Sequence, residues 1–138
     1  MRLFIASADK TLRLALLMLL ESEPGLVVIG MSDRRAGLLT MVGTSQPEVV
    51  LLDDGLARQA TAHLVGDLHH LKDQPKVIVL SINPQTKAAT LAAGADGFIS
   101  KTMPPDELLP LLRSMRLSDT HLCPPQGPRV DPAVGTPA

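Results

Sequence analysis

An apolar run that ends in two carboxylates constrains this chain more than any other feature of its sequence. Residues Val49 to Leu52 are all aliphatic, and Asp53 and Asp54 follow directly. A strand that is apolar on both faces belongs in the middle of a parallel sheet, where ligands collect beyond the carboxyl ends of the strands. Asp53 is therefore the first residue to consider for function. Position alone leaves a second interpretation open, in which the acids only open a turn or cap a helix.

Short β-type runs alternate with helical segments along the chain. The predicted strands are Leu3 to Ala6, Leu26 to Ile29, Val49 to Leu52, Val77 to Leu80 and Gly97 to Ile99. The predicted helices are Thr11 to Glu21, Arg34 to Thr44 behind an Asp33 cap, Thr61 to Leu71, Gln85 to Ala93 with Gly94 as its stop, and a last helix that starts near Pro105. Five β/α units indicate an α/β fold, a doubly wound five-stranded parallel sheet with helices on both faces.

The last part of the chain differs in composition from the rest. Pro110 should kink the last helix or delay its start, because proline removes a backbone hydrogen bond. Residues 118–138 hold five prolines and two glycines without a periodic apolar face. The sequence therefore predicts one domain over residues 1–117, followed by a tail or a truncated linker over residues 118–138.

Composition argues against several classes of function. The chain has no Trp or Tyr and two Phe, and its 13 basic side chains nearly balance its 14 acidic ones. It therefore lacks the stacking residues and the positive field of a nucleic-acid binder. The apolar run Leu14 to Leu20 is too short to span a membrane, and a single cysteine, Cys123, forms no internal disulfide. We expect a cytoplasmic protein that binds neither nucleic acid nor membrane directly.

Polar residues follow four of the predicted strands. Ser7 follows the first strand, Asp53 the third, Ser81 the fourth, and Lys101 lies just past the fifth. In a doubly wound sheet these strand ends lie side by side, so an acid, a hydroxyl and an ammonium can meet in one small site. A carboxylate can attack a phosphoryl group, while an ammonium neutralises the developing charge and a hydroxyl donates to a phosphoryl oxygen. Aspartyl phosphorylation needs these parts.

Four segments carry a family resemblance. They are Arg2-Leu3-Phe4-Ile5-Ala6, Pro47-Glu48-Val49-Val50-Leu51-Leu52-Asp53, Val77-Ile78-Val79-Leu80-Ser81 and Ala93-Gly94-Ala95-Asp96-Gly97-Phe98-Ile99-Ser100-Lys101. With these segments the chain resembles the CheY-like receiver domain of two-component response regulators, particularly receivers that precede a helix-turn-helix output domain. The resemblance covers roughly residues 2 to 117, and its last segment is the most specific.

The resemblance implies a role for each of four residues. It makes Asp53 the phosphoacceptor, Ser81 the switch hydroxyl, Lys101 the phosphate-binding lysine and Phe98 the aromatic residue that reorients on activation. It also implies a flavodoxin-like strand order of 2-1-3-4-5.

The chain departs from the family at the metal site. In the family two acids follow the first strand and hold Mg²⁺, whereas this chain has Ser7 and Ala8 there, with an acid one step later at Asp9. The remaining donors are Asp53, the carbonyl of Gly55 and, if the first loop turns inward, Asp9. Because Mg²⁺ is normally held by one or two carboxylates together with phosphate, its site is predicted to be weak or missing.

These features lead to two hypotheses about function. The first is an atypical receiver that serves as a switch or docking module, not a turnover enzyme, whose partner is a histidine kinase or another signalling protein. The alternative is the receiver half of a helix-turn-helix DNA-binding transcriptional regulator whose output domain is absent from this chain.

Two weaker signals concern the helices. The helix Thr11 to Glu21 is apolar nearly all round, which suggests a homodimer through it, with coverage by the tail as the alternative. His63, Asp67 and His70 share one face of a later helix, where they either bind a transition metal or form a solvated flank.

Overall fold

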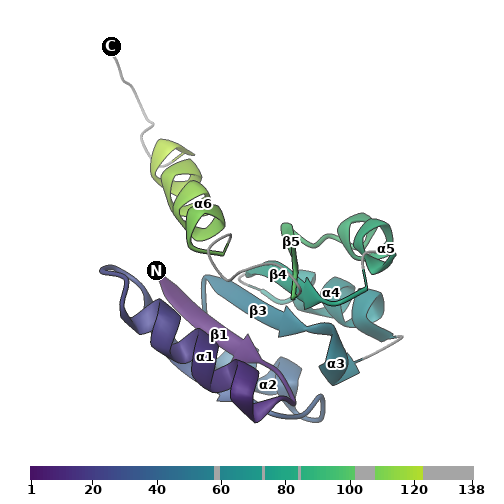
Figure 1. The fold of residues 1–138 in the computed structure, drawn as a ribbon. Helices are drawn as coiled ribbons and strands as arrows, with labels where there is room; N and C mark the ends of the chain where they lie inside the picture. Colours follow the sequence, from purple (N-terminus) through teal and green to yellow (C-terminus); the bar gives the residue numbers. More distant parts are fainter. Residues whose placement is uncertain (58–59, 73, 84, 102–107, 123–138) are drawn as a thin grey trace. The chain divides into compact units, whose positions relative to one another are not determined.

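Two compact units make up the chain, Met1–Pro104 and Pro105–Ala138, and each is described by itself. The computed structural model describes residues 1–57, 60–72, 74–83, 85–101 and 108–122 (Figure 1). The predicted boundary between a domain and a tail at residue 117 lies inside a helix of the second unit.

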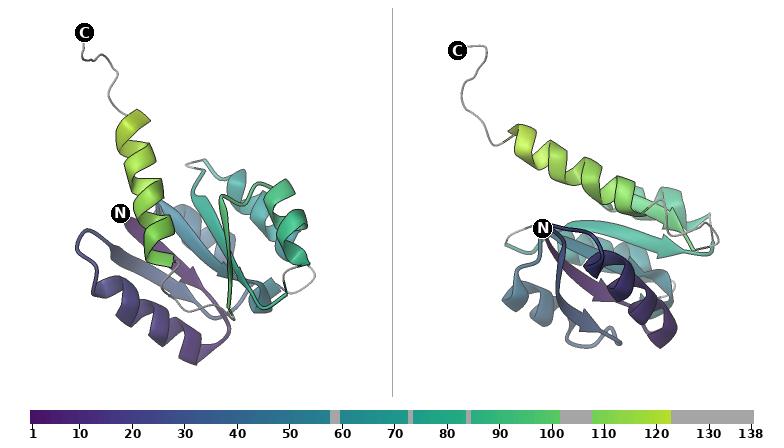
Figure 2. Two further views of the ribbon diagram at one scale, coloured as in Figure 1. Left: turned by 45° about the horizontal axis from the view of Figure 1, so that its top comes forward. Right: turned by 60° about the vertical axis from the view of Figure 1, so that its left-hand side comes forward.

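A five-stranded parallel sheet forms the centre of the first unit. Its strands are β1 (Arg2–Ala6), β2 (Val27–Ser32), β3 (Val49–Asp53), β4 (Lys76–Ser81) and β5 (Gly97–Ser100). They are ordered β2-β1-β3-β4-β5, as can be followed in Figure 2, and every neighbouring pair is parallel. The predicted fold class and strand order are confirmed. Each predicted strand is present, and β2 extends furthest beyond its predicted end.

Within the described residues of the first unit, five helices flank this sheet. They are α1 (Lys10–Glu21), α2 (Leu38–Ser45), α3 (Asp54–Ala57), α4 (Thr61–His69) and α5 (Thr86–Ala92). Figure 1 shows α1 in front of the sheet, with α2 and α4 behind it. Helices therefore cover both faces, as expected for strands that are apolar on both sides.

The core is divided between the two faces because successive side chains of a strand point in opposite directions. Phe4, Val50 and Val77 belong to a buried cluster that includes residues of α2 and α4. Their neighbours Leu3, Leu51 and Ile78 are fully buried as well, and alternation directs them to the other face. β3 is buried over its whole length, which matches its prediction as a central strand.

The start of α2 differs from its prediction. The helix begins at Leu38 rather than Arg34, and its cap position is Gly37, with φ +78° and no side-chain hydrogen bond. A residue in the left-handed region cannot continue a right-handed helix, so the helix starts after it. Asp33, the predicted cap, instead pairs with Arg34 at 3.2 Å.

The end of α5 follows its prediction. The helix ends at Ala92, and Gly94 adopts φ +116°. This conformation favours glycine, and a Cβ there would also lie 3.3 Å from the His69 ring. The α4 helix ends at His69, two residues before its predicted end at Leu71.

The second unit contains α6 (Leu108–Leu122). Its predicted start near Pro105 lies outside the described residues. Pro110 lies within α6, two residues after the first described residue of that helix. The helix continues past Leu117 to Leu122, into the segment predicted as a tail. Among the helices of the described residues, none has both the length and the hydropathy that a membrane span requires.

Candidate functional site

Asp53 is a buried carboxylate at the end of β3. Asp53 as a whole is 2% exposed. The Ser7 hydroxyl donates a hydrogen bond to Asp53 Oδ2 at 2.7 Å, and the Gly55 N–H donates to Oδ1 at 3.0 Å. Lys101 Nζ also donates to Oδ1 and forms an ion pair with it. Both oxygens of Asp53 therefore already have partners supplied by the chain.

The interaction between Asp53 and Lys101 favours the charged form of both side chains. Burial alone would raise the pKa of Asp53, but hydrogen bonds from Lys101, Ser7 and Gly55 outweigh it and hold the pKa below its usual value. Burial would likewise lower the pKa of Lys101, yet its hydrogen bond to Asp53 and the charges of Asp53 and Asp54 raise it. At neutral pH the two residues form a standing ion pair.

Asp54 is a site residue that the sequence interpretation missed. It is the first residue of α3, and its Oδ2 accepts a hydrogen bond from the Ser81 hydroxyl. Its Oδ1 lies 3.5 Å from Lys101 Nζ. The signal in the sequence is its place directly after Asp53, a position that is also compatible with opening a turn.

The register of the sheet explains why Ser7 contacts Asp53 and Ser81 contacts Asp54. Ala6 lies opposite Leu52, so Ser7 comes level with Asp53. Asp53 itself lies opposite Leu80, so Ser81 comes level with Asp54. The predicted convergence of an acid, a hydroxyl and an ammonium is therefore present, but Ser81 contacts Asp54 and Ser7 contacts Asp53.

Ser81 organises the loop between β4 and α5. Its oxygen accepts hydrogen bonds from the Asn83 N–H at 2.9 Å and the Thr86 hydroxyl at 3.2 Å. The residue is fully buried. The Asp54 carboxylate is thereby connected, through one hydroxyl, to the residues that open α5.

The Asp9 side chain caps a helix and does not contact Asp53. Its carboxylate accepts from the N–H groups of Thr11 and Leu12 at 2.9 and 3.2 Å and so caps α1. Its own N–H donates to the Ser7 oxygen at 3.1 Å. In the part of the chain that the structure describes, no three His, Cys, Asp or Glu side chains are grouped to hold a metal ion.

The Asp9 cap leads to a test of stability. Asp9→Ala is expected to lower the free energy of unfolding by about 1 kcal/mol, because two N–H groups at the start of α1 lose their acceptor. Asp9→Ser should recover most of this loss, since a serine oxygen can accept the same bonds. Urea unfolding measures both variants. Equal stability of Asp9→Ala and the unchanged protein would contradict the cap.

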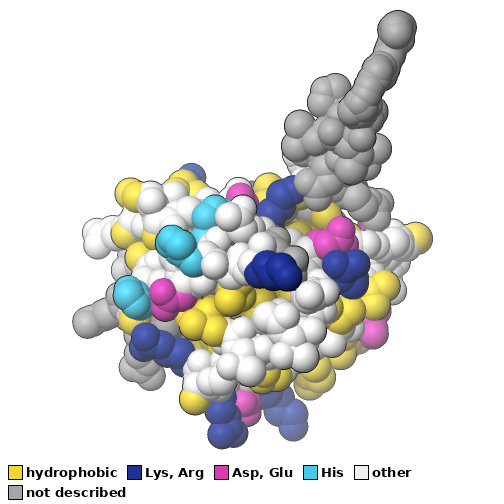
Figure 3. All heavy atoms as spheres, turned by 180° about the vertical axis from the view of Figure 1, so that it is seen from behind, with side chains coloured by type: hydrophobic (Ala, Val, Ile, Leu, Met, Phe, Trp, Pro, Cys, Tyr) yellow, Lys and Arg dark blue, Asp and Glu magenta, His cyan; other side chains and the backbone are white. Residues whose placement is uncertain are grey.

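The remaining predicted residues make contacts with other parts of the chain. Phe98 on β5 is half-buried and packs against the core cluster. His63 Nε2 lies 3.5 Å from Asp67 Oδ2; the His63 side chain is exposed and that of Asp67 is partly exposed. His70 Nδ1 contacts the Gly66 carbonyl at 2.6 Å. Figure 3 shows histidine, acidic and basic side chains interspersed on the face seen from behind, which is typical of a solvated flank.

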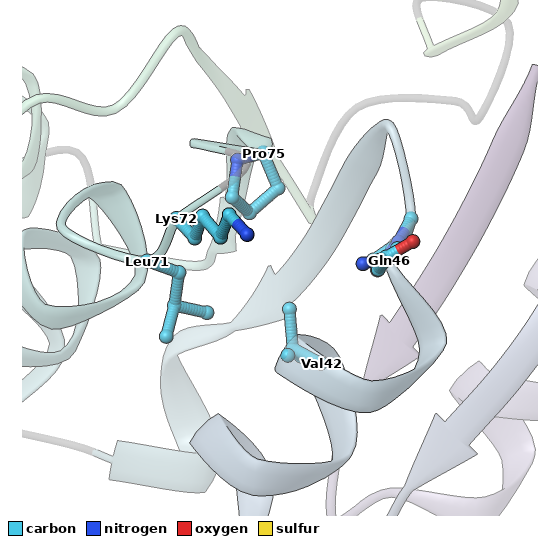
Figure 4. A pocket seen from close by; sticks show the side chains of 7 residues that line it. Val42, Gln46, Leu71, Lys72 and Pro75 are labelled. Atoms are coloured by element: carbon cyan, nitrogen blue, oxygen red, sulfur yellow. The ribbon is translucent and has the colours of Figure 1, made fainter.

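A shallow pocket lies at the opposite edge of the sheet. Figure 4 shows its lining, which includes Val42, Gln46, Leu71, Lys72 and Pro75. Pro47, which also lines the pocket, precedes β3, and Pro75 precedes β4. The pocket is therefore at the amino ends of these strands, whereas Asp53 is at the carboxyl end of β3. It therefore contributes nothing to the carboxylate site.

Part of the apolar surface of α1 is exposed. Leu14 is 49% exposed and Met18 is 73% exposed. Leu16 and Leu20 form its buried side. The homodimer through this helix stays a prediction, and these exposed side chains are the ones that it would cover.

Comparison with known proteins places this geometry in a family. Residues 3–113 match the family model of the response regulator receiver domain. The chain is 33% identical over 110 residues to a protein of Pseudomonas aeruginosa named as a candidate transcriptional regulator, an alignment that covers 78% of this chain and 53% of that protein. The chain thus spans about half the length of the curated relative that it matches.

Solved structures with low sequence identity share the fold. A DNA-binding response regulator of the LuxR family from Staphylococcus aureus has a TM-score of 0.73 at 18% identity, covering 82% of this chain and 96% of that one. RcsB of Salmonella enterica serovar Typhimurium, bound to promoter rprA with the phosphomimetic BeF3-, has a TM-score of 0.75 at 19% identity, covering 84% of this chain and 60% of that one. With its fold and the match over residues 3–113, this chain belongs to the family of response regulator receiver domains.

Proposed function

We propose that this chain is an atypical receiver, a signalling switch or docking module in a two-component phosphorelay, with Asp53 at the phosphoacceptor position and with impaired magnesium-dependent phosphorylation. One observation carries the proposal. Both oxygens of Asp53 are held by groups of the chain itself, with the Ser7 hydroxyl on one and Lys101 on the other. A phosphoryl donor has to displace these contacts before it can reach the carboxylate.

The donor set after β1 supports the metal part of this proposal. Ser7 supplies a hydroxyl that is fully buried and bound to Asp53, Ala8 supplies a methyl group, and the carboxylate of Asp9 is engaged at α1. Mg²⁺ prefers carboxylates and near-ideal octahedral geometry, so these residues fit it poorly. Without such an ion, a phosphoryl group and Asp53 meet as two anions, which repel by about 4 kcal/mol at contact in an effective dielectric near 20.

The proposed partner is a histidine kinase or another signalling protein that docks on the receiver surface. In this role the chain acts as a module and not as a turnover enzyme. The standing pair of Asp53 and Lys101 imitates one signalling state without phosphate, so docking need not depend on phosphorylation.

A second candidate function has its own support. The relative from Pseudomonas aeruginosa is named as a candidate transcriptional regulator, and this chain spans 53% of its length. By this alternative, the chain is the receiver half of a helix-turn-helix transcriptional regulator. A helix-turn-helix segment in the longer reading frame would favour it.

Intact-mass spectrometry after incubation with acetyl phosphate and Mg²⁺ tests the phosphorylation part. We expect no stoichiometric adduct, because the carboxylate is already engaged and the ion lacks ligands. The Asp53→Asn variant serves as the control, since any mass increase that it still shows arises elsewhere. A full single phosphoryl adduct that is lost in Asp53→Asn would refute impaired phosphorylation.

A further inference from the structure

Asp54 makes the contacts that an external anion would need at this site. Its two oxygens face the Ser81 hydroxyl, which donates to Oδ2, and Lys101 Nζ, which lies 3.5 Å from Oδ1. A hydroxyl donor and an ammonium are the groups with which proteins bind phosphate oxygens. Both are occupied here by a side chain of the same polypeptide.

The sheet register makes this arrangement persistent. Asp53 pairs with Leu80 across β3 and β4, so the residues that follow them, Asp54 and Ser81, lie level at the edge. Ser81 is fully buried and also accepts from the Asn83 N–H at 2.9 Å, which fixes its oxygen. A contact between two fixed neighbours loses little conformational entropy, in contrast to one with a free ligand.

The charge balance points in the same direction. Lys101 is the ammonium in contact with both Asp53 and Asp54. Among the described residues, one ammonium is therefore shared by two carboxylates before any ligand arrives. A phosphate dianion approaching this edge meets a local excess of negative charge.

We infer that Asp54 is the resident anion of the site, which occupies Ser81 and Lys101 and so excludes phosphate or a phosphoryl group from them. This inference rests on the proposed receiver function and names the residue that regulates access to its site. Asp54 is a positioning residue in this scheme, since it acts through Ser81 and Lys101.

The experiment is a titration of the full chain with inorganic phosphate in the absence of Mg²⁺. The NMR chemical shifts of the backbone amides of Asn83 and Lys101 monitor phosphate binding. Asp54→Ala should bind phosphate at least about tenfold more tightly than the unchanged chain, because it frees the Ser81 hydroxyl and removes one of the two carboxylates that face Lys101. Asp54→Asn, which keeps the size of the side chain, should also tighten binding. Circular dichroism confirms that each variant is folded.

Asp67→Ala is the matched control. It also removes one negative charge, but from a partly exposed position on α4 that pairs with His63. It should leave phosphate affinity unchanged. Equal affinity of both Asp54 variants and the unchanged chain would overturn the inference, and so would an equal gain in Asp67→Ala. The intact-mass experiment on the unchanged chain tests the proposed function separately. The inference about Asp54 and the proposed function can therefore fail independently of each other.

Discussion

Lys101→Met is expected to lower the free energy of unfolding by about 3 to 5 kcal/mol, measured by urea unfolding at pH 7. Asp53 is 2% exposed, and Lys101 is the cation that contacts it. Removing the ammonium leaves a buried carboxylate with two neutral hydrogen-bond donors, Ser7 and the Gly55 N–H. Neutral donors do not compensate for the loss of hydration of a charge.

A double-mutant cycle supplies the control. Asp53→Asn alone should cost less than Lys101→Met, because Lys101 keeps Asp54 as a partner at 3.5 Å. In the Asp53→Asn background, Lys101→Met should cost little more, since the buried charge is already gone. A loss below about 1 kcal/mol for Lys101→Met in the unchanged background would mean that the pair does not hold Asp53 in its charged form.

The pH dependence of this loss follows from the directions of the two pKa shifts. The folded protein lowers the pKa of Asp53, so this contribution to stability is present above the unfolded value of about 3.9 and is lost as pH falls through the folded pKa. It raises the pKa of Lys101, so that contribution is present below about 10.4 and is lost as pH rises through the folded pKa. The cost of Lys101→Met should therefore be greatest between these limits and shrink in acid.

Ser7→Asp is the second change with a large expected effect, about 3 to 4 kcal/mol of unfolding free energy in the absence of divalent ions. The Ser7 hydroxyl lies 2.7 Å from Asp53 Oδ2, and Ser7 is fully buried. A carboxylate at this position replaces a donor with a like charge in a poorly hydrated site. Urea unfolding in the presence of a chelator measures the loss.

Magnesium should then restore the stability that Ser7→Asp loses. Two adjacent carboxylates are the ligands that Mg²⁺ prefers, and an ion that binds only the folded state raises stability by about 2.7 kcal/mol at one hundred times its dissociation constant. The unchanged chain should show no comparable response to Mg²⁺. Ser7→Asn is the matched control, because it has the size of aspartate without the charge. A similar magnesium response in the unchanged chain would contradict the proposed loss of the metal site.

Local sequence signals predicted the elements well where one strong physical cause dominates. The run from Val49 to Leu52 is apolar on both sides, and this pattern suits a central parallel strand, which β3 is. Gly94 ends α5 because few other residues adopt its positive φ. The start of α2 was predicted wrongly, since the sequence pattern favours Asp33 as the cap, whereas the backbone reaches the helix only after Gly37, with its positive φ.

The sequence by itself determined that an acid, hydroxyls and a lysine would follow the strands of one parallel sheet, because the strands are apolar, the intervening segments are helical, and parallel strands share one carboxyl edge. Only the tertiary structure decided which of these groups touch. Ser7 meets Asp53, and Ser81 meets Asp54, because the register between neighbouring strands sets which residues are level at the edge. Register depends on how the apolar pattern of each strand packs against segments far apart in the chain, so only the tertiary contacts fix which residues are level.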